Sequence, residues 1–180
     1  MKKIILLLAL VFPVISTAES YLGLGGGIGS IQESGIDDAF LTYVYGGHQF
    51  NEYLSLEIAY MKSASFSATG DRVFDPLNQV FNVNNDKIYG EAWIPSLSLH
   101  YIENNWKLFA LIGNAFWQAR TNDEGVGVND EDTDFAYGLG IEYRPAKWGL
   151  RAEWRRLEID WIITGETELD AFLISLNRYF

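Results

Sequence analysis

Alternation of apolar and polar residues with a period of two runs through almost the whole chain, and it limits the possible folds more than any other feature. From Ser20 onward the alternating segments are rich in Tyr, Phe, Trp, Leu and Ile, and no stretch follows the 3.6-residue period of a helix convincingly. We predict eight strands, at residues 20–32, 39–50, 53–68, 87–102, 106–120, 134–145, 148–159 and 169–180. The expected fold class is therefore all-β.

The connections between these strands alternate in length. Short turns at 51–52, 103–105 and 146–147 separate longer connections at 32–39, 69–86, 121–133 and 160–168. An even-numbered meander of this kind has both chain ends at one rim, as outer-membrane barrels do, with short periplasmic turns and longer extracellular loops. The rhythm predicts an eight-stranded antiparallel up-and-down transmembrane β-barrel over residues 19–180.

Bulky apolar residues and charged residues lie on opposite faces of the same strands. Leu56 and Ile58 share one face of the third strand, and Glu57 lies on the other. The interior of a closed eight-stranded barrel is filled by side chains, and it tolerates charges when they are paired. We therefore expect the apolar face to meet lipid and the charges to form a lumenal network of three carboxylates and three arginines. Its members would be Glu57, Glu142, Glu153, Arg144, Arg151 and Arg155.

A soluble lipocalin-like barrel is the alternative fold. It would carry apolar residues inward and polar residues outward, which is the inverse of the pattern in the third, sixth and seventh strands. Aromatic residues near the strand ends also favour the membrane barrel, because amphipathic rings anchor a barrel at the two lipid interfaces. The expected girdles are Phe50, Tyr101, Trp106, Tyr143, Trp148 and Phe180 at one end, and Tyr60, Trp93, Phe116 and Trp154 at the other.

The first 18 residues are typical of a cleaved secretory signal peptide. Lys2 and Lys3 precede an apolar run over 4–15, and small residues follow at 16–18. The run is shorter than the roughly 20 residues that a spanning helix needs. Removal of the two lysines would lower the formal net charge from -11 to -13, which argues against nucleic acid as a partner. The chain has no cysteine, so no disulfide stabilises it.

The predicted long connections carry most of the acidic residues. We interpret these residues as a solvated rim, and the alternative is an acidic surface for a basic partner or for divalent cations. The stretch 122–132 does not have the spacing of an EF-hand, so we predict no metal site. The connection 69–86 also contains apolar residues, which either form a contact patch or pack on their own neighbours. They are Val73, Phe74, Leu77, Val80 and Phe81.

Three stretches resemble the OmpA-like and OmpX-type small outer-membrane barrels. "GGHQFNEYLSLEIAY" (46–60) resembles the second and third strands of the OmpA transmembrane domain, and "GIEYRPAKWGLRAEW" (140–154) resembles its sixth and seventh. "AFLISLNRYF" (171–180) resembles the terminal-strand signal read by the barrel-assembly machinery. The residues on the face of that signal are Phe172, Ile174, Leu176 and Phe180. The resemblance covers essentially the mature chain, and we expect no peptidoglycan-binding domain after it.

The resemblance also implies how the lumenal charges pair. In that family a Glu of strand three pairs with an Arg of strand seven, and Glu57 and Arg151 match these positions. A Glu of strand six, matched by Glu142, pairs with a Lys of strand four, but Ser98 stands at the position of that lysine. A charge-swapping gate like the one proposed for the family would therefore need Arg144 or Arg155 as a substitute.

Three classes of function can be compared. A lipid A modifying barrel enzyme needs a nucleophile and a base near the outer leaflet, whereas His48 and His100 both lie near periplasmic turns, so we predict no catalytic residue. A narrow ion-conducting, porin-like barrel is disfavoured by the inward side chains of Tyr43, Tyr45 and Phe109. We expect a structural or surface-interaction, adhesion-like protein in the outer membrane of a Gram-negative bacterium, without cofactor. Its expected partners are membrane lipid and lipopolysaccharide, the assembly machinery and an unknown surface partner.

Overall fold

A computed structural model describes residues 18–32, 36–67, 87–121, 129–161 and 165–180. The predicted signal peptide, except for its last residue, and the apolar connection 69–86 lie outside these ranges. No helix in the described ranges is long and apolar enough to cross a membrane. The strands are β1 (Glu19–Ile31), β2 (Ala39–Gln49), β3 (Leu54–Ser63), β4 (Phe66–Ser67), β5 (Lys87–Glu103), β6 (Trp106–Thr121), β7 (Asn129–Tyr143), β8 (Trp148–Trp161) and β9 (Gly165–Tyr179).

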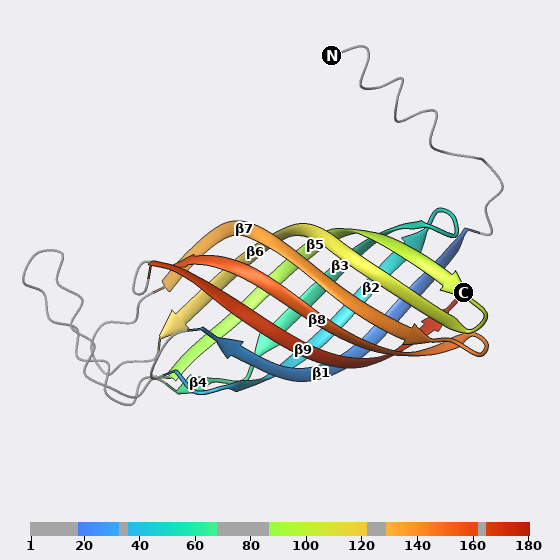
Figure 1. Cartoon of the computed structure of the whole chain (residues 1–180). Helices are drawn as coiled ribbons and strands as arrows, with labels where there is room; N and C mark the ends of the chain where they lie inside the picture. The colour runs from blue at the N-terminus through green and yellow to red at the C-terminus, as the bar shows by residue number, and fades with distance from the viewer. Residues whose placement is uncertain (1–17, 33–35, 68–86, 122–128, 162–164) are drawn as a thin grey trace, which may run out of the picture.

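The strands form one antiparallel sheet that closes into a barrel (Figure 1). The order is β3-β2-β1-β9-β8-β7-β6-β5-β4, and pairing of β3 with β5 completes the ring. β3 and β4 both pair with β5 and are separated by Ala64 and Ser65, so together they make one wall strand. The predicted eight-stranded meander is therefore confirmed. The start of β1 and the end of β9 lie at the rim with the short turns, which we call the turn end; the opposite rim is the loop end.

Two strand boundaries differ from the predictions by more than two residues, both at the loop end. β7 begins at Asn129 rather than 134, where it pairs with Arg120 of β6, and β9 begins at Gly165 rather than 169, opposite Trp161 of β8. Much of the connections predicted at 121–133 and 160–168 is thus paired strand. Asp and Glu are depleted in strands, so the composition of these residues favours a loop, but backbone pairing with one long neighbouring strand continues through them.

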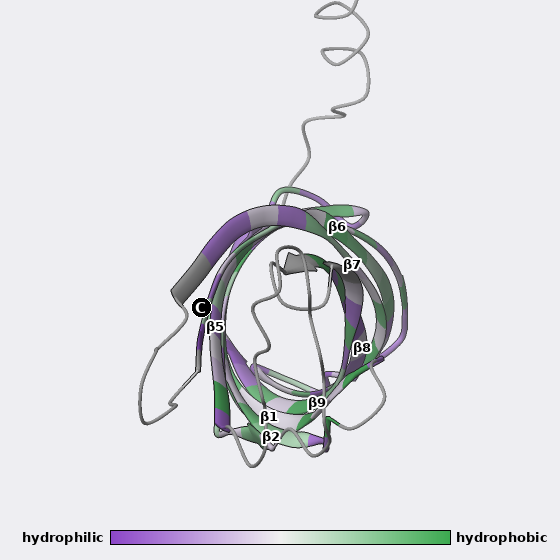
Figure 2. Ribbon diagram, turned by 90° about the vertical axis from the view of Figure 1, so that its left-hand side faces the viewer, coloured by the Kyte–Doolittle hydropathy of each residue, from purple (hydrophilic) through white to green (hydrophobic). Residues whose placement is uncertain are grey.

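The two faces of the wall differ as the alternation indicates. Viewed along its axis, the ring shows hydrophilic and hydrophobic residues alternating along its strands (Figure 2). Leu24 and Ile174 are 68% and 63% exposed on the outside, whereas Glu57 and Arg155 are each 1% exposed inside. All six aromatic residues predicted for the girdle at the turn end are exposed; of the other girdle, Trp93 and Phe116 are exposed and Tyr60 and Trp154 half-buried.

Along its length the lumen has two compositions. Towards the loop end the inward side chains are apolar, as for Leu41, Met61 and Leu157. Towards the turn end they include Glu57, Glu142 and other charged or polar groups. β8 supplies both apolar and charged side chains, because its inward residues at every second position are Arg151, Glu153, Arg155 and Leu157. The candidate site lies where the two compositions meet.

Candidate functional site

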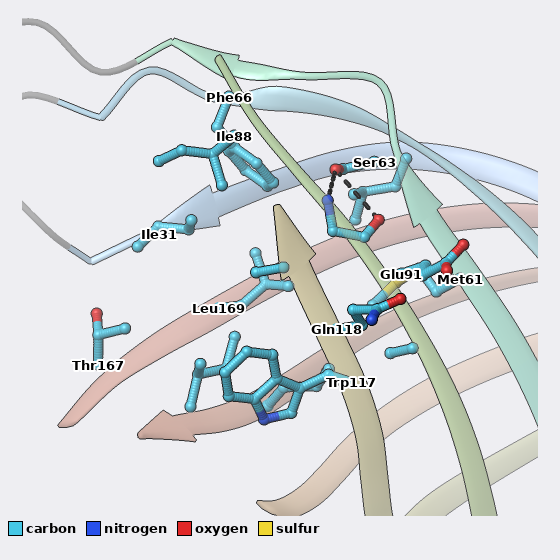
Figure 3. A pocket seen from close by; sticks show the side chains of 16 residues that line it. Ile31, Met61, Ser63, Phe66, Ile88, Glu91, Trp117, Gln118, Thr167 and Leu169 are labelled. Atoms are coloured by element: carbon cyan, nitrogen blue, oxygen red, sulfur yellow. Dashed lines mark hydrogen bonds between the residues drawn. The ribbon is translucent and has the colours of Figure 1, made fainter. Parts of the chain in front are cut away.

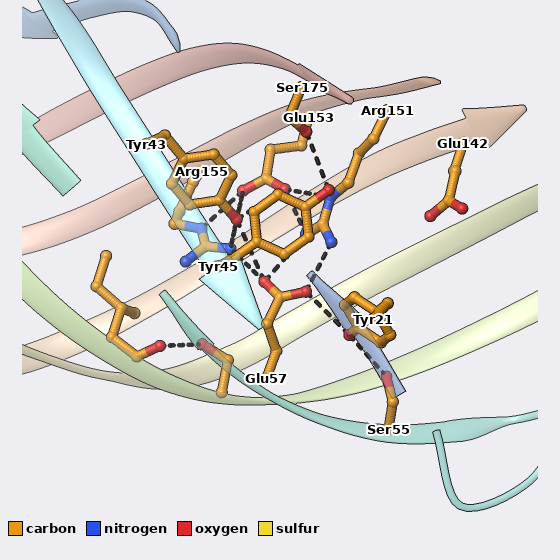
Figure 4. A network of polar contacts seen from close by, with 12 residues as sticks. Tyr21, Tyr43, Tyr45, Ser55, Glu57, Glu142, Arg151, Glu153, Arg155 and Ser175 are labelled. Carbon is orange, nitrogen blue, oxygen red and sulfur yellow. Dashed lines mark hydrogen bonds and ion pairs between the residues drawn. The ribbon is translucent and has the colours of Figure 1, made fainter. Parts of the chain in front are cut away.

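Two carboxylates and two guanidinium groups meet across the lumen (Figure 4). Glu57 comes from β3, and Arg151, Glu153 and Arg155 come from β8, where the period of two places all three on the inward face. β3 and β8 lie opposite one another, four strands apart in either direction around the ring. The network therefore spans the barrel from wall to wall.

Each arginine bridges both carboxylates. Arg151 Nη1 lies 2.6 Å from Glu57 Oε2, and Arg151 Nε donates to Glu153 Oε2 at 2.6 Å. Arg155 Nη2 lies 3.1 Å from Glu57 Oε1 and 2.8 Å from Glu153 Oε1. The four formal charges cancel. Isolated buried charges cost several kcal/mol each, whereas this closed arrangement compensates every one with two opposite charges.

Aromatic side chains surround the network. The Tyr43 hydroxyl accepts from Arg155 Nη2 at 3.0 Å and lies 3.2 Å from Glu57 Oε1, to which it donates. The Tyr21 hydroxyl donates to Glu57 Oε2 at 3.0 Å. The Arg151 guanidinium lies over the ring of Tyr45, 4.5 Å from its centroid, and over that of Phe109 at 4.2 Å. The rings exclude water and add cation–π attraction to the ion pairs.

The structure places the other two predicted members of the network elsewhere. Glu142 lies to one side (Figure 4), where it accepts a hydrogen bond from the Tyr179 hydroxyl at 2.7 Å. Although Glu142 is in register with Arg151, the Arg151 guanidinium reaches across the lumen to Glu57 instead. Arg144 pairs with Glu19 at 2.6 Å near the turn end. The geometry thus contains a two-against-two network, and the three-against-three arrangement is wrong.

Sequence reasoning missed a buried lysine. Lys107 of β6 is only 6% exposed, lies in register with Glu142 and has its Nζ atom 5.3 Å from the centroid of Tyr21. The family has a lysine at the position of Ser98, and this serine is buried. The sequence did contain the evidence for its position, because Lys107, Phe109 and Leu111 are alternate residues of one strand and therefore share its inward face.

The remaining candidate residues lie at the outer face or near the turn end. His48 is exposed and its Nδ1 lies 3.1 Å from Ser20 Oγ on the neighbouring strand, while His100 is buried and its Nε2 lies 3.3 Å from the Asn51 carbonyl oxygen. Within the described ranges, no group of His, Asp and Glu side chains is arranged to hold a metal ion. The residues of the expected assembly signal project outward and are exposed on β9 or just beyond it: Phe172, Ile174, Leu176 and Phe180.

Comparison with known proteins supports the fold. No curated protein sequence matches the chain significantly. The crystal structure of Ail, the attachment invasion locus protein of Yersinia pestis, superposes on 92% of this chain and 100% of its own chain, with a TM-score of 0.63 and 14% identity. The crystal structure of Neisserial surface protein A superposes on 92% of this chain and 98% of its own, with a TM-score of 0.63 and 13% identity. The N-terminal β-barrel domain of Pseudomonas aeruginosa OprF matches 92% of the chain and 98% of its own length, with a TM-score of 0.60 and 10% identity. At these identities the likeness establishes the fold alone.

A family profile extends the match to the sequence. Residues 4–180 match the family described as outer membrane protein beta-barrel domain, and the solved structures above are small outer-membrane barrels. The expected likeness to OmpA-like and OmpX-type barrels and the location in the outer membrane are thereby confirmed. This chain therefore belongs to the outer membrane protein beta-barrel domain family.

Proposed function

We propose that this protein is a non-conducting outer-membrane barrel with a structural or surface-interaction role, exerted at the loop end of its strands. The observation that carries the proposal is the closure of the lumen. Glu57 and the charged residues of β8 bridge the two walls, and the rings of Tyr43 and Tyr45 stack beside them with centroids 4.8 Å apart. An ion on this path would have to lose its water among paired charges, and then pass apolar side chains.

The loop end supplies the surface for the proposed interaction. β7, β8 and β9 extend there as paired strands, which hold polar side chains in fixed positions outside the hydrocarbon layer. Acidic residues outnumber basic ones among the described residues at this end. The acidic residues are Asp37, Asp38, Glu91, Glu131, Asp132, Asp134, Glu158, Glu168 and Asp170, and the basic ones are Lys62, Lys87, Arg120 and Arg156.

The charge of this surface favours a positively charged partner. Ail has been crystallised in complex with the heparin analogue sucrose octasulfate, which is a polyanion. An acid-dominated surface repels such a ligand and attracts cationic segments at long range. We therefore infer that the surface partner of this barrel carries clustered Lys or Arg residues. Lipid and lipopolysaccharide surround the wall below this surface.

A binding experiment in lipid nanodiscs tests this function. The barrel should bind immobilised polylysine and not immobilised heparin, and the binding should weaken as salt is raised from 50 to 300 mM, about the range in which surface charge is screened. The double variant Glu131→Gln with Asp132→Asn should weaken binding, whereas Glu103→Gln, an exposed carboxylate at the turn end, should not. Equal binding to heparin, or equal loss in the control, would contradict the proposal.

We also propose that the outward face of β9 is read by the barrel-assembly machinery. Phe172, Ile174 and Phe180 form a row of large exposed side chains along the last wall strand, which supports this role. Phe180→Ala should lower the amount of folded barrel in the outer membrane while leaving refolding into detergent in vitro unchanged. Phe40→Ala, an equally lipid-facing change on β2, serves as the control. Equal losses in both variants would argue for simple lipid anchoring.

A further inference from the structure

The lumen contains an apolar cavity between the charged network and the loop end. Figure 3 shows the side chains that line it. Its volume is about 60 Å³, and side chains from most of the wall strands line it. The principal ones are Leu41, Met61, Phe66, Ile88, Trp117 and Leu169. We propose that this cavity binds the end of an unbranched alkyl chain with an uncharged hydroxyl head group, an aliphatic alcohol that enters from the extracellular side. The inference is independent of the proposed surface role.

The charged network closes the floor of the cavity. Leu41 and Leu157 line the cavity, and the next inward residues of the same strands are Tyr43 and Arg155, both members of the network and about 1% exposed. Ile31 and Thr167 lie at the loop-end limits of β1 and β9, so the cavity extends to the loop-end limit of the described wall. A ligand that enters therefore cannot cross the barrel. The arrangement is that of a binding pocket rather than a channel.

Size and chemistry select a linear hydrocarbon. An apolar cavity of about 150 Å³ holds benzene, so the present cavity of about 60 Å³ is too small for a ring but takes the last methylene and methyl groups of a chain. Water needs two to four polar partners in such a site. Three polar side chains of the lining are already engaged elsewhere. The Ser63 hydroxyl lies 2.7 Å from the Gly90 nitrogen, Glu91 accepts from the Tyr60 hydroxyl at 2.8 Å, and Gln118 accepts from Arg120 at 2.7 Å. Each methylene that enters should raise affinity about fourfold.

An unpartnered hydroxyl supplies a place for the head group. Thr167 is 8% exposed, and its Oγ1 atom has no hydrogen-bond partner among the residues that the structure describes. A hydroxyl both donates and accepts, so it complements the hydroxyl of an alcohol. A carboxylate head group fits less well, because Asp37 and Asp38 are exposed at this rim, where the Asp37 backbone nitrogen donates to the Ser67 carbonyl oxygen at 2.9 Å.

The cavity contains a convenient reporter, Met61. Met61 and Met1 are the only methionines of the sequence. The barrel is labelled with ¹³C-methyl methionine, refolded into phospholipid nanodiscs and titrated with octan-1-ol. We expect a saturable shift of the Met61 methyl signal and a nuclear Overhauser effect to the alkyl chain. Octanoate should bind more weakly, and Thr167→Val should weaken octanol binding by about three- to tenfold, the effect of one lost hydrogen bond.

Two filling variants separate binding in the cavity from partitioning into lipid. Ala92→Leu adds three carbons to the cavity wall, and Gly90→Ala adds a methyl that meets Ser63 Oγ at an ordinary 3.7 Å and so preserves folding. Both should weaken or abolish the saturable shift. Ala110→Leu, which adds the same three carbons on the lipid-facing side of β6, should leave it unchanged. A shift that grows linearly with octanol, that persists in both filling variants, or that octanoate produces equally well would overturn the proposal.

Discussion

At the scale of single residues, the charge balance of the lumen explains how Glu57 can stand in an apolar stretch of sequence. Its neighbours Leu56 and Ile58 face the hydrocarbon, and its own carboxylate faces two arginines and two tyrosine hydroxyls. Because the four charged groups are buried in the lumen, loss of one member leaves an uncompensated buried charge. That cost exceeds the value of any one hydrogen bond in the network.

Removal of one carboxylate should therefore destabilise the barrel strongly. Glu153→Gln leaves Arg151 and Arg155 sharing only Glu57, and we expect the free energy of unfolding to fall by about 3 kcal/mol. Urea unfolding in phospholipid vesicles, followed by tryptophan fluorescence and by heat-modifiable electrophoretic mobility, measures the loss. The double variant Glu153→Gln with Arg155→Gln restores neutrality and should lose less than the sum of the two single variants. Additive losses would show that the four charges do not act as a unit.

A second prediction concerns a glycine on the inward face of β1. A Cβ atom at Gly27 would lie 1.8 Å from the Phe172 carbonyl oxygen, so a methyl group there forces the β1 and β9 backbones apart. Gly27→Ala should lower the free energy of unfolding by about 2 kcal/mol or more. Gly46 is the matched control, because a Cβ there has its nearest contact at 3.5 Å, and Gly46→Ala should be tolerated. Equal losses in the two variants would show that crowding of the Cβ atom at Gly27 does not decide the cost.

Parity along a strand predicts which face a residue occupies, but not how far its side chain reaches. The inward positions of Glu57, Arg151 and Arg155 followed from the period of two alone. The separate partners of Glu142 and Arg144 did not follow from it. Parity leaves Arg151, for example, free to pair with Glu142 beside it or with Glu57 across the lumen. Only the diameter of the closed ring and the crowding of the tyrosines decide between these partners.

At the scale of elements, the number and order of strands could be predicted, whereas two of their ends could not. The hydrophobic belt of each strand is encoded by lipid-facing residues such as Leu139 and Ile174, and this part of the prediction was accurate. Beyond the belt, water replaces lipid, and the apolar signal ceases although the ladder of backbone hydrogen bonds continues. β7 therefore continues to Asn129 through residues whose composition is typical of a loop.

The hairpin between β5 and β6 provides a test at this scale. Asn104 has a φ of 56°, the left-handed region, in the short turn after Glu103. A β-branched residue is strained there, so Asn104→Val should cost about 1–2 kcal/mol of unfolding free energy, whereas Asn104→Gly should be nearly neutral. Asn105→Val changes the next residue of the same turn without this constraint and should be tolerated. Urea titration in vesicles would contradict the assignment if the two valine variants were equally unstable.

At the scale of the whole molecule, two barriers of different chemistry lie in series along the lumen. The network of Glu57 and β8 holds paired charges that do not exchange readily with mobile ions, and the mainly apolar side chains between it and the loop end offer an ion few ligands. Either barrier alone would narrow the path. Together they would make the proposed non-conducting barrel compatible with a polar lumen.

Removal of part of the charged network should consequently create a measurable ion current. In planar bilayers the wild-type barrel should show at most rare, small openings, and the double variant Tyr43→Ala with Arg155→Ala should raise the frequency and size of openings. The current should be cation-selective, because loss of Arg155 leaves the network with one excess carboxylate charge. The control is Val44→Ala with Arg156→Ala, which truncates the adjacent outward side chains of the same strands. Steady large openings of the wild type would instead support the narrow porin-like alternative, and equal currents in the variant and its control would locate the barrier elsewhere than in the network.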